Sequence, residues 1–339
     1  MRTSFRAWAS RQFAPPRLLA QLSLLALLTA SSGCSLRTYA VNMVGDALAS
    51  GDSVYETDDD IELVGTALPF GLKLTESLLV QSPDHPGLLL TACRGFTMYS
   101  YAFVAYEAEL LNEVDLDRAR AMRRRARKLY LRGAHYGFHA LERNYPGLEQ
   151  ALVTDPAAAV AKIGSKHRTR DVPLLYWTAA ALGLAISASI DDAALLARLP
   201  EVGALLDRAL ALDEAWDDGA LHEFKVIVAG GQPGKAGDKA AIDAHYTRAL
   251  ELSKGASAGL FVAYAEAVSL PAQNKTEFRA LLERAIAVDP DRQPRDRLAT
   301  LVSQRRARWL LGRIDDLILT DDGSTSAGGM RWSDTGVSR

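Results

Sequence analysis

The chain has 339 residues, of which 48% are hydrophobic and 24% charged, as is typical of a globular protein large enough to bury a core. Its formal net charge of −2 gives no excess of basic residues that would favour nucleic acid as a partner. Alanine and leucine are abundant and long runs of β-branched residues are absent, which favours helices over strands.

Residues 1–33 have the features of a secretory signal rather than of a folded domain. Four arginines precede an apolar segment at 18–28, which is too short to span a membrane as a helix. Small residues then lead to Cys34, and a cysteine in this position resembles the bacterial lipobox, in which the cysteine is lipidated and becomes the mature N-terminus. We therefore expect a lipoprotein signal peptide at 1–33 and a lipid-anchored segment with a linker at 34–60.

Two residues beside this cysteine qualify the lipoprotein prediction. Ser31 stands where the lipobox usually has leucine, so a soluble periplasmic protein or an uncleaved anchor are the alternatives. Ser35, rather than aspartate, follows the cysteine, and its resemblance to lipoprotein sorting rules favours the outer membrane. Cys93 would then be the free cysteine, and its apolar surroundings predict a small buried side chain with no disulfide partner.

Apolar residues recur at helical spacing through the rest of the chain, and glycine, proline or aspartate stands at each junction. We predict helices at 36–49, 61–67, 70–80, 88–111, 114–144, 171–188, 200–212, 215–229, 235–252, 258–268, 275–288 and 296–319, with two short helical pieces within 148–163. Pro69 is expected to break the first pair. The helical domain is predicted to cover 61–319, and the tail at 320–339, rich in Gly, Ser and Asp, is predicted to be disordered.

The helix expected at 114–144 begins with a strongly basic tract. Its cationic residues are Arg118, Arg120, Arg123, Arg124, Arg125, Arg127 and Lys128. A solvated helix face is the simpler interpretation, and contact with an acidic partner or with lipid headgroups is the alternative. The envelope location that the signal predicts argues against nucleic acid.

The stretch at 171–200 predicts a helix, a short turn and the start of the next helix. Asp171 can cap this helix, because its carboxylate can accept from N–H groups of the first turn, and Pro173 suits that turn. Small residues at 179–181 and at Gly183 would let a neighbouring helix approach closely. This pattern is typical of a helix inside a stacked array.

Three segments resemble one another and align on Ala209, Ala249 and Ala285, with a weaker copy at Ala140. The tetratricopeptide pattern places a proline five positions after this alanine, and Pro290 fits, whereas the other copies lack it. We therefore predict an all-α fold built as a degenerate tetratricopeptide-like helical repeat array, an α-solenoid or bundle. A generic helical bundle is the alternative.

No set of residues indicates an enzyme. His135 and His139 have a spacing that suits a metal, but no third ligand is evident, and a packed or surface pair is the simpler interpretation. The glycine-rich segment from Val226 lacks the residues of a phosphate-binding loop, and the acidic run at 58–60 lacks calcium-loop spacing. We predict no catalytic residue, no metal and no cofactor.

Several segments, taken in order, resemble the TatT family, the T component associated with TRAP (tripartite ATP-independent periplasmic) transporters. They are DDIELVGTALPFGLKLTESLLVQSPDHPGLL, FTMYSYAFVAYEAE, DVPLLYWTAAALGLAIS, LPEVGALLDRALALDEAWDDGALHEF and LVSQRRARWLLGRIDDL. This resemblance, over 41–319, implies a lipid-anchored, all-helical homotrimer with a pore or cleft through each subunit. It also implies pairing with the periplasmic solute-binding protein, the P component, and delivery of ligand to it. The basic tract and the tail have no counterpart in the family pattern.

These observations favour a non-enzymatic accessory subunit of a TRAP-type solute uptake system. It would face the periplasm from a lipid anchor in the outer membrane, bind or pass a small organic solute, and dock a periplasmic solute-binding protein. The alternative is an outer-membrane scaffold lipoprotein whose helical repeats dock other envelope proteins. A cavity lined by polar and aromatic residues would distinguish the first function from the second.

Nine residues are candidates for a ligand path: Lys73, Glu76, Tyr99, Tyr101, Tyr176, Trp177, Trp216, His222 and Glu223. Each has a structural alternative, since Tyr176 and Trp177 could be core packing, and Lys73 and Glu76 could be a surface ion pair worth little. The arginines around Trp309 could bind an anionic ligand, stack on an aromatic ring or face solvent. They are Arg305, Arg306 and Arg308.

Overall fold

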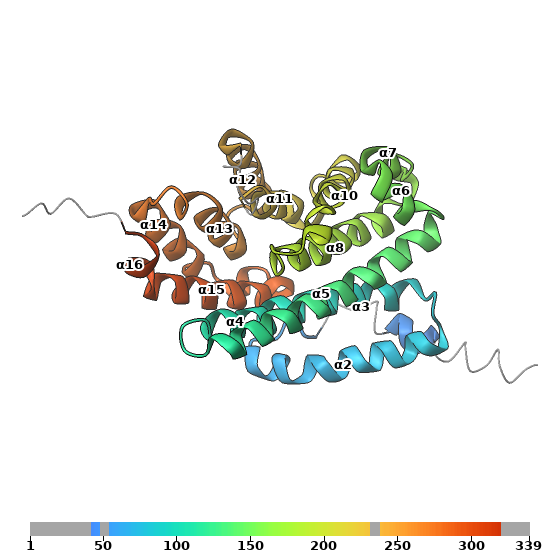
Figure 1. Ribbon diagram of the computed structural model, residues 1–339, viewed down its shortest axis with the longest axis horizontal. Coiled ribbons are helices and arrows are strands. Elements are labelled where there is room, and N and C mark those ends of the chain that lie inside the picture. Colours follow the sequence, from blue (N-terminus) through green and yellow to red (C-terminus); the bar gives the residue numbers. More distant parts are fainter. Residues whose placement is uncertain (1–41, 48–53, 231–237, 320–339) are drawn as a thin grey trace, which may run out of the picture.

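The computed structural model describes residues 42–47, 54–230 and 238–319, and every regular element within these ranges is a helix (Figure 1). The predicted all-α class is therefore confirmed. The signal peptide, Cys34 and the tail at 320–339 lie outside the described residues. The tetratricopeptide-like repeat character and the domain boundaries stay predictions.

The helices form two groups that lie side by side (Figure 1). The first group comprises α2 (Ile61–Gln81), α3 (Pro86–Tyr99), α4 (Tyr106–Leu110), α5 (Leu116–Asn144), α6 (Leu148–Thr154), α7 (Pro156–Ala161), α8 (Arg168–Ser187), α9 (Ala193–Leu196) and α10 (Leu199–Leu212). Its long helices α2, α3, α5, α8 and α10 pack in this order, each against the one before. The second group comprises α11 (Ala220–Gly230), α12 (Lys239–Ser253), α13 (Ala258–Tyr264), α14 (Lys275–Ile286), α15 (Arg297–Gly312) and α16 (Ile314–Leu317).

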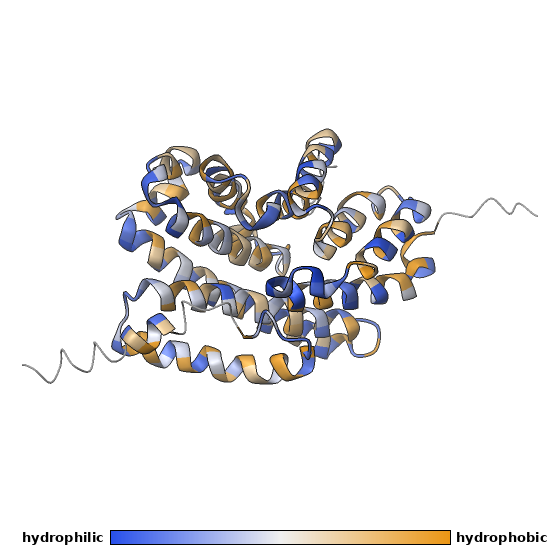
Figure 2. Cartoon of the chain, turned by 180° about the vertical axis from the view of Figure 1, so that it is seen from behind, coloured by the Kyte–Doolittle hydropathy of each residue, from blue (hydrophilic) through white to orange (hydrophobic). Residues whose placement is uncertain are grey.

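Each group has its own cluster of buried hydrophobic residues, around Leu175 in the first and around Phe278 in the second. Helix α11 joins the two clusters, because Leu221 and Phe224 belong to the first and Val226 to the second. Figure 2 shows hydrophobic and hydrophilic residues interleaved along most helices, as expected when each helix turns one face to the core and the other to solvent.

Local signals at the helix starts explain where many of the elements begin. The side chains of Asp60, His85 and Asp115 accept from first-turn N–H groups of α2, α3 and α5. Ser257 and Asn274 do the same for α13 and α14. Such caps satisfy donors that have no partner within the helix and contribute about 1 kcal/mol each.

The residues before α2 lie against α15 and close the arrangement. The backbone N–H of Leu298 donates to the carbonyl oxygen of Glu56 at 2.9 Å. Arg297 Nη1 donates to the carbonyl oxygen of Thr57 at 2.8 Å. These bonds bring the segment around Glu56 to the rim of the space between the two groups.

The predicted break at Pro69 is wrong, because α2 runs without interruption through this residue. Proline removes one backbone hydrogen bond, which disfavours a helix interior. Here the apolar stripe continues on both sides of it, with Val64, Leu72 and Leu79 buried. Packing of both halves along α3 therefore outweighs the local preference.

The aromatic helix expected at 88–111 is present but is interrupted by a wider turn. A π-helical segment, η1 (Ser100–Ala105), links α3 to α4. Segments of this kind are frequent at functional sites. It changes the direction in which the residues after Tyr99 point, among them Tyr101.

Asp171 does not cap the helix expected at 171–188. Helix α8 begins at Arg168, and Asp171 is fully buried in its first turn. Its carboxylate accepts from the Tyr145 hydroxyl and, at 2.8 Å, from Arg170 Nε. A buried carboxylate requires such partners, so Asp171 joins α8 to the end of α5 instead of capping.

Candidate functional site

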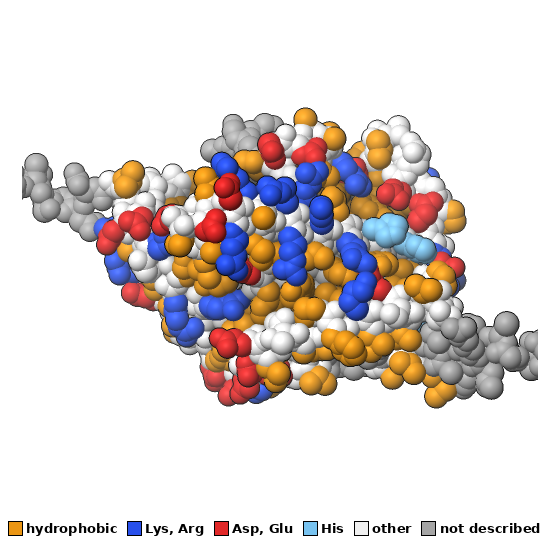
Figure 3. Space-filling model, turned by 60° about the horizontal axis from the view of Figure 1, so that its bottom comes forward, with side chains coloured by type: hydrophobic (Ala, Val, Ile, Leu, Met, Phe, Trp, Pro, Cys, Tyr) orange, Lys and Arg blue, Asp and Glu red, His pale blue; other side chains and the backbone are white. Residues whose placement is uncertain are grey.

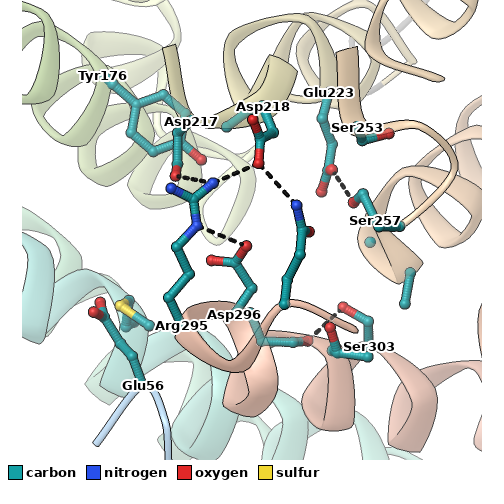
Figure 4. A pocket seen from close by; sticks show the side chains of 18 of the residues that line it. Glu56, Tyr176, Asp217, Asp218, Glu223, Ser253, Ser257, Arg295, Asp296 and Ser303 are labelled. Atoms are coloured by element: carbon teal, nitrogen blue, oxygen red, sulfur yellow. Dashed lines mark hydrogen bonds and ion pairs between the residues drawn. The ribbon is translucent and has the colours of Figure 1, made fainter. Parts of the chain in front are cut away.

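A cavity of about 190 Å³ lies where the two groups of helices meet (Figure 4). Its lining residues come from α3, α8, α11, α12, α13 and α15 and from two short turns, η3 (Trp216–Gly219) and η6 (Pro294–Asp296). Glu56, from the segment that closes onto α15, also lines it. We call this space the central cavity.

Aromatic side chains of α8 form one wall of the central cavity. Tyr176 and Trp177 both line it, with ring centroids 4.9 Å apart in an edge-on arrangement. Trp216 and Phe224 pack against Tyr176, at 4.9 and 5.8 Å between centroids. This packing fixes Tyr176 and Trp177, which are only partly buried and so present ring surface to the cavity.

Three aspartates converge on a single guanidinium in the central cavity (Figure 4). Arg295 donates to Asp218, and its nitrogens lie 3.8 Å from an Asp217 oxygen and 3.5 Å from an Asp296 oxygen. Gln293 Nε2 also donates to Asp218, at 2.8 Å. One positive charge therefore faces three negative charges.

The pKa values of two aspartates show that this compensation is incomplete. Burial raises the pKa of Asp217, and the negative charge of Asp296 adds to this shift. Burial also raises the pKa of Asp296, against the opposing charge of Arg295. A positive charge placed in the cavity would stabilise both ionised carboxylates.

Glu223 of α11 adds a further carboxylate to the same space. Its Oε2 accepts from the Ser257 hydroxyl at 2.6 Å, which ties α11 to the start of α13. Burial raises the pKa of Glu223 to about 7, with Asp217 and Asp296 adding to the shift and Ser257 opposing it. A Cβ atom at Gly259 would collide with the Glu223 carboxylate, so glycine makes room for it.

The turn η3 has an unusual backbone. Asp217, Asp218 and Gly219 adopt left-handed conformations in succession, with φ of 51°, 51° and 97°. Each such aspartate costs about 1 kcal/mol, and strained residues of this kind cluster at functional sites. The helix predicted at 215–229 accordingly starts only at Ala220.

Sequence reasoning missed the charged residues of the central cavity, namely Asp217, Asp218, Arg295 and Asp296. The Asp-Asp-Gly triplet was a usable signal, because these residues favour turns and left-handed conformations. Nothing local indicated that Arg295 would meet this turn, more than seventy residues away in sequence.

A smaller cavity of about 30 Å³ lies at η1 and α15. Tyr101 lines it together with Arg305 and Arg306. The Arg306 guanidinium pairs with Glu266 at 2.6 Å and with Glu109 at 2.5 Å. Arg306 is therefore neutralised within the protein.

The other two arginines near Trp309 differ from each other. Arg305 stacks on the Tyr106 ring, 4.5 Å from its centroid, and donates to the carbonyl oxygen of Ala102. Arg308 is exposed. Of the three interpretations left open, stacking holds for Arg305 and solvent exposure for Arg308.

Tyr101 also faces the interior region beside the central cavity. It is 43% exposed, yet burial raises the pKa of its hydroxyl to about 12. Protein atoms therefore surround the hydroxyl, although part of the side chain is accessible. Glu223 contributes to the raised pKa of both Tyr101 and Tyr176, so the three side chains share one region.

Lys73 and Glu76 lie away from the central cavity, in a joint between α2 and α5. Glu76 is 7% exposed and accepts from Lys73 Nζ at 2.7 Å and from the Tyr136 hydroxyl at 2.8 Å, and it pairs with Arg132. Burial would raise the pKa of Glu76, but the hydrogen bonds and the charge of Arg132 outweigh it and lower the pKa. The interpretation as a surface ion pair is therefore wrong for Glu76.

The remaining candidates also lie outside the lining. The Tyr99 hydroxyl, at the end of α3, accepts from Arg125 of α5 at 3.2 Å. Trp216 lies behind Tyr176. His222 is buried against α12, with its Nδ1 2.8 Å from the Nδ1 of His245.

Three of the nine candidates, Tyr176, Trp177 and Glu223, therefore line the central cavity. The histidine pair considered for a metal has another contact, since His139 lies 2.9 Å from Asp84. Among the described residues, no three His, Cys, Asp or Glu side chains form a group that could hold a metal ion.

Comparison with known proteins places the chain in a family. A family model described as "TRAP transporter T-component" matches residues 57–318, which confirms the resemblance seen in the sequence. The chain is also 31% identical over 305 residues to an uncharacterized protein of Treponema pallidum (strain Nichols), covering 85% of this chain and 94% of that protein. The chain therefore belongs to the TRAP transporter T-component family and is an accessory component of a TRAP transporter system.

Proposed function

We propose that this protein is a lipid-anchored, non-enzymatic subunit that binds or passes a small organic solute through the central cavity. It docks a periplasmic solute-binding protein and works as a homotrimer anchored through Cys34 to the outer membrane, facing the periplasm. The observation that carries the proposal is the central cavity, because a protein that only docks other proteins needs no interior space lined by charged and aromatic residues.

The chemistry of the central cavity favours a solute that carries a positive charge. Arg295 pairs with three of the five carboxylates that line the cavity, and Glu56 pairs with Arg94 outside the lining. The five belong to Glu56, Asp217, Asp218, Glu223 and Asp296. The rings of Tyr176 and Trp177 add faces that attract cations. A small organic ammonium compound would place a positive charge beside the carboxyl groups of Asp217, Glu223 and Asp296, whose pKa values burial raises.

Docking of a solute-binding protein is tested by affinity capture from detergent-solubilised membranes of cells that produce the tagged chain. We expect a periplasmic solute-binding protein among the captured partners, and mass spectrometry would identify it. Repeated capture of other envelope proteins without any solute-binding protein would favour the scaffold function instead.

The lipid anchor is tested separately by metabolic labelling with a radioactive fatty acid. We expect the wild-type chain to incorporate the label and Cys34→Ser to lose it. The reactive group of Cys93 is buried, so it does not compete as an acceptor. Equal labelling of both chains would contradict lipidation at Cys34.

A further inference from the structure

Helices α2 and α5 share one outer face of the molecule, which we call the α2–α5 face (Figure 3). Figure 3 shows lysine and arginine side chains in a row across this face, with hydrophobic side chains beside them and acidic side chains mainly towards its edges. The exposed hydrophobic residues of α2 are Leu63, Phe70, Leu74 and Val80. Phe70 and Val80 are 74% and 75% exposed, and neighbouring exposed apolar side chains of this kind mark surfaces that contact a protein or a membrane.

Part of the basic row has no partner within the described chain. Arg118 pairs with Glu107 at 2.8 Å, so its charge is compensated. Arg124 and Lys128 are exposed, and no described residue forms a hydrogen bond or ion pair with either. Because they are four residues apart on α5, both point outward on the same side.

Helix α2 lies along the protein surface rather than apart from it. Of the described helices it is the one long and apolar enough, by length and composition, to cross a membrane. Its inner side, however, packs Leu72 and Leu79 into the core and joins α5 through the buried Glu76. The exposed side that remains is the kind of apolar surface that lies in a membrane interface.

The N-terminal end of the described chain lies at one end of this face. Asn42 accepts from the Ser82 hydroxyl at 2.8 Å, at the turn after α2. Cys34 precedes Asn42 by eight residues, which span at most about 28 Å when extended. An acyl chain on Cys34 would therefore hold the bilayer surface near this end of α2.

We propose that the α2–α5 face rests on the surface of a bilayer that contains anionic phospholipid. The exposed side chains of α2 enter the interface, and Arg124, Lys128 and their neighbours meet the phosphate groups. Basic charge, unpartnered apolar side chains and the reach of the anchor all favour this occupant. The reach of the anchor rests on the proposed lipidation of Cys34, whereas the other two observations do not.

The test uses the full chain carrying Phe70→Cys, reconstituted into vesicles and labelled with an environment-sensitive, thiol-reactive fluorophore. Cys93 is fully buried and does not react. We expect nitroxide-labelled lipid to quench the fluorophore in vesicles of equal parts phosphatidylglycerol and phosphatidylcholine, with less quenching in phosphatidylcholine alone. Val153→Cys is the matched control, because Val153 is 66% exposed on α6. That position should stay unquenched.

Charge reversal sharpens this test. Quenching at position 70 gives the ratio of protein with this face on the bilayer to protein with this face free. Arg124→Glu combined with Lys128→Glu should lower this ratio more than about tenfold, since each basic residue near an anionic surface raises membrane binding about fivefold. Lys162→Glu with Lys166→Glu, two exposed lysines after α7, should leave the ratio unchanged. Loss of this difference would overturn the proposal.

Two further results would also overturn it. Position 70 could stay as unquenched as position 153 on anionic vesicles. The fluorophore at position 70 could also be shielded from water in detergent solution as much as on anionic vesicles. That result would mean that a second copy of the chain covers this face. Labelling of the wild-type chain separates these results from failure of the anchor, because an unlipidated Cys34 would take up the fluorophore.

Discussion

Two glutamates that looked alike as ligand candidates occupy opposite environments, Glu76 in the joint between α2 and α5 and Glu223 in the central cavity. Glu76 accepts hydrogen bonds from Lys73 and Tyr136 and pairs with Arg132, and these interactions lower its pKa. Glu223 accepts one hydrogen bond, from the Ser257 hydroxyl, and burial raises its pKa to about 7. The protein has thus satisfied one carboxylate and left the other short of positive partners.

This difference separates a structural role from a binding role. A carboxylate whose partners come from the chain itself stabilises the fold, since its ionised form is already compensated. A carboxylate that pays the cost of burial without a cation is stabilised when a ligand supplies one. We therefore propose that Glu76 stabilises the fold and that Glu223 binds the ligand, and the following variants test that assignment.

The largest effect is expected for Glu76→Gln, which leaves Arg132 and Lys73 without their carboxylate. We expect the free energy of unfolding at neutral pH to fall by about 3 kcal/mol, near the low end for a broken buried ion pair because Lys73 is largely exposed. Chemical denaturation measures this change. Glu149→Gln, at an exposed position of α6, is the control and should stay within about 0.5 kcal/mol of the wild type.

Glu223→Gln should have the opposite sign. Its pKa is about 7 in the folded chain against an ordinary value of 4.5, so the folded state binds the proton more tightly. The wild type therefore loses stability as pH rises from 4.5 through 7. At pH 8 the variant should be more stable by about 2 kcal/mol, and the gap should close in acid. A variant less stable than the wild type at pH 8 would contradict the assignment.

Trp177 and Trp216 extend the comparison to the aromatic residues. Trp177 lines the central cavity, whereas Trp216 lies behind Tyr176. Trp177→Ala should weaken binding of an organic ammonium probe about fivefold to tenfold, the range of a cation–π contact. Trp216→Ala should mainly lower thermal stability. Calorimetric titration and thermal unfolding of both variants measure the two effects. If Trp177→Ala bound the probe as tightly as the wild type, Trp177 would not belong to the binding site.

The smallest effect is expected at the histidine pair outside the central cavity. Burial lowers the pKa of His222 and of His245, so the folded state disfavours their protonation. Stability is therefore present above the ordinary pKa of 6.5 and is lost as pH falls below it. His245→Gln should reduce this acid sensitivity by about 1 kcal/mol and leave ligand affinity unchanged. A shift in ligand affinity would place the pair in the site.

The helical architecture was predictable because its signals are local. Period-3.6 patterns and capping residues such as Asp115 and Asn274 depend on a few neighbouring positions. The two local rules that failed, at Pro69 and Asp171, were overridden by packing and by a buried ion pair, which only the assembled chain provides.

The central cavity was predictable only in part. The sequence pointed to Tyr176, Trp177 and Glu223 because aromatic and acidic side chains often bind ligands, and the structure brings these three together. Arg295 belongs to the cavity because it pairs with Asp217 and Asp218. These residues are distant from it in the sequence, so no local pattern predicts the contact. Lys73 and Glu76 were wrongly placed on a ligand path for the same reason. Arg132, which pairs with Glu76, lies on another helix, and the sequence does not show this contact.

The central claim is that the carboxylates of the central cavity bind a cationic solute. Calorimetric titration at pH 8 with choline and with the uncharged alcohol in which carbon replaces its nitrogen tests this directly. We expect choline to bind about tenfold more tightly to the wild type, and this preference to fall to about twofold in Glu223→Gln. Equal binding of the two probes by the wild type, tighter binding of succinate, or an unchanged preference in Glu223→Gln would contradict the claim.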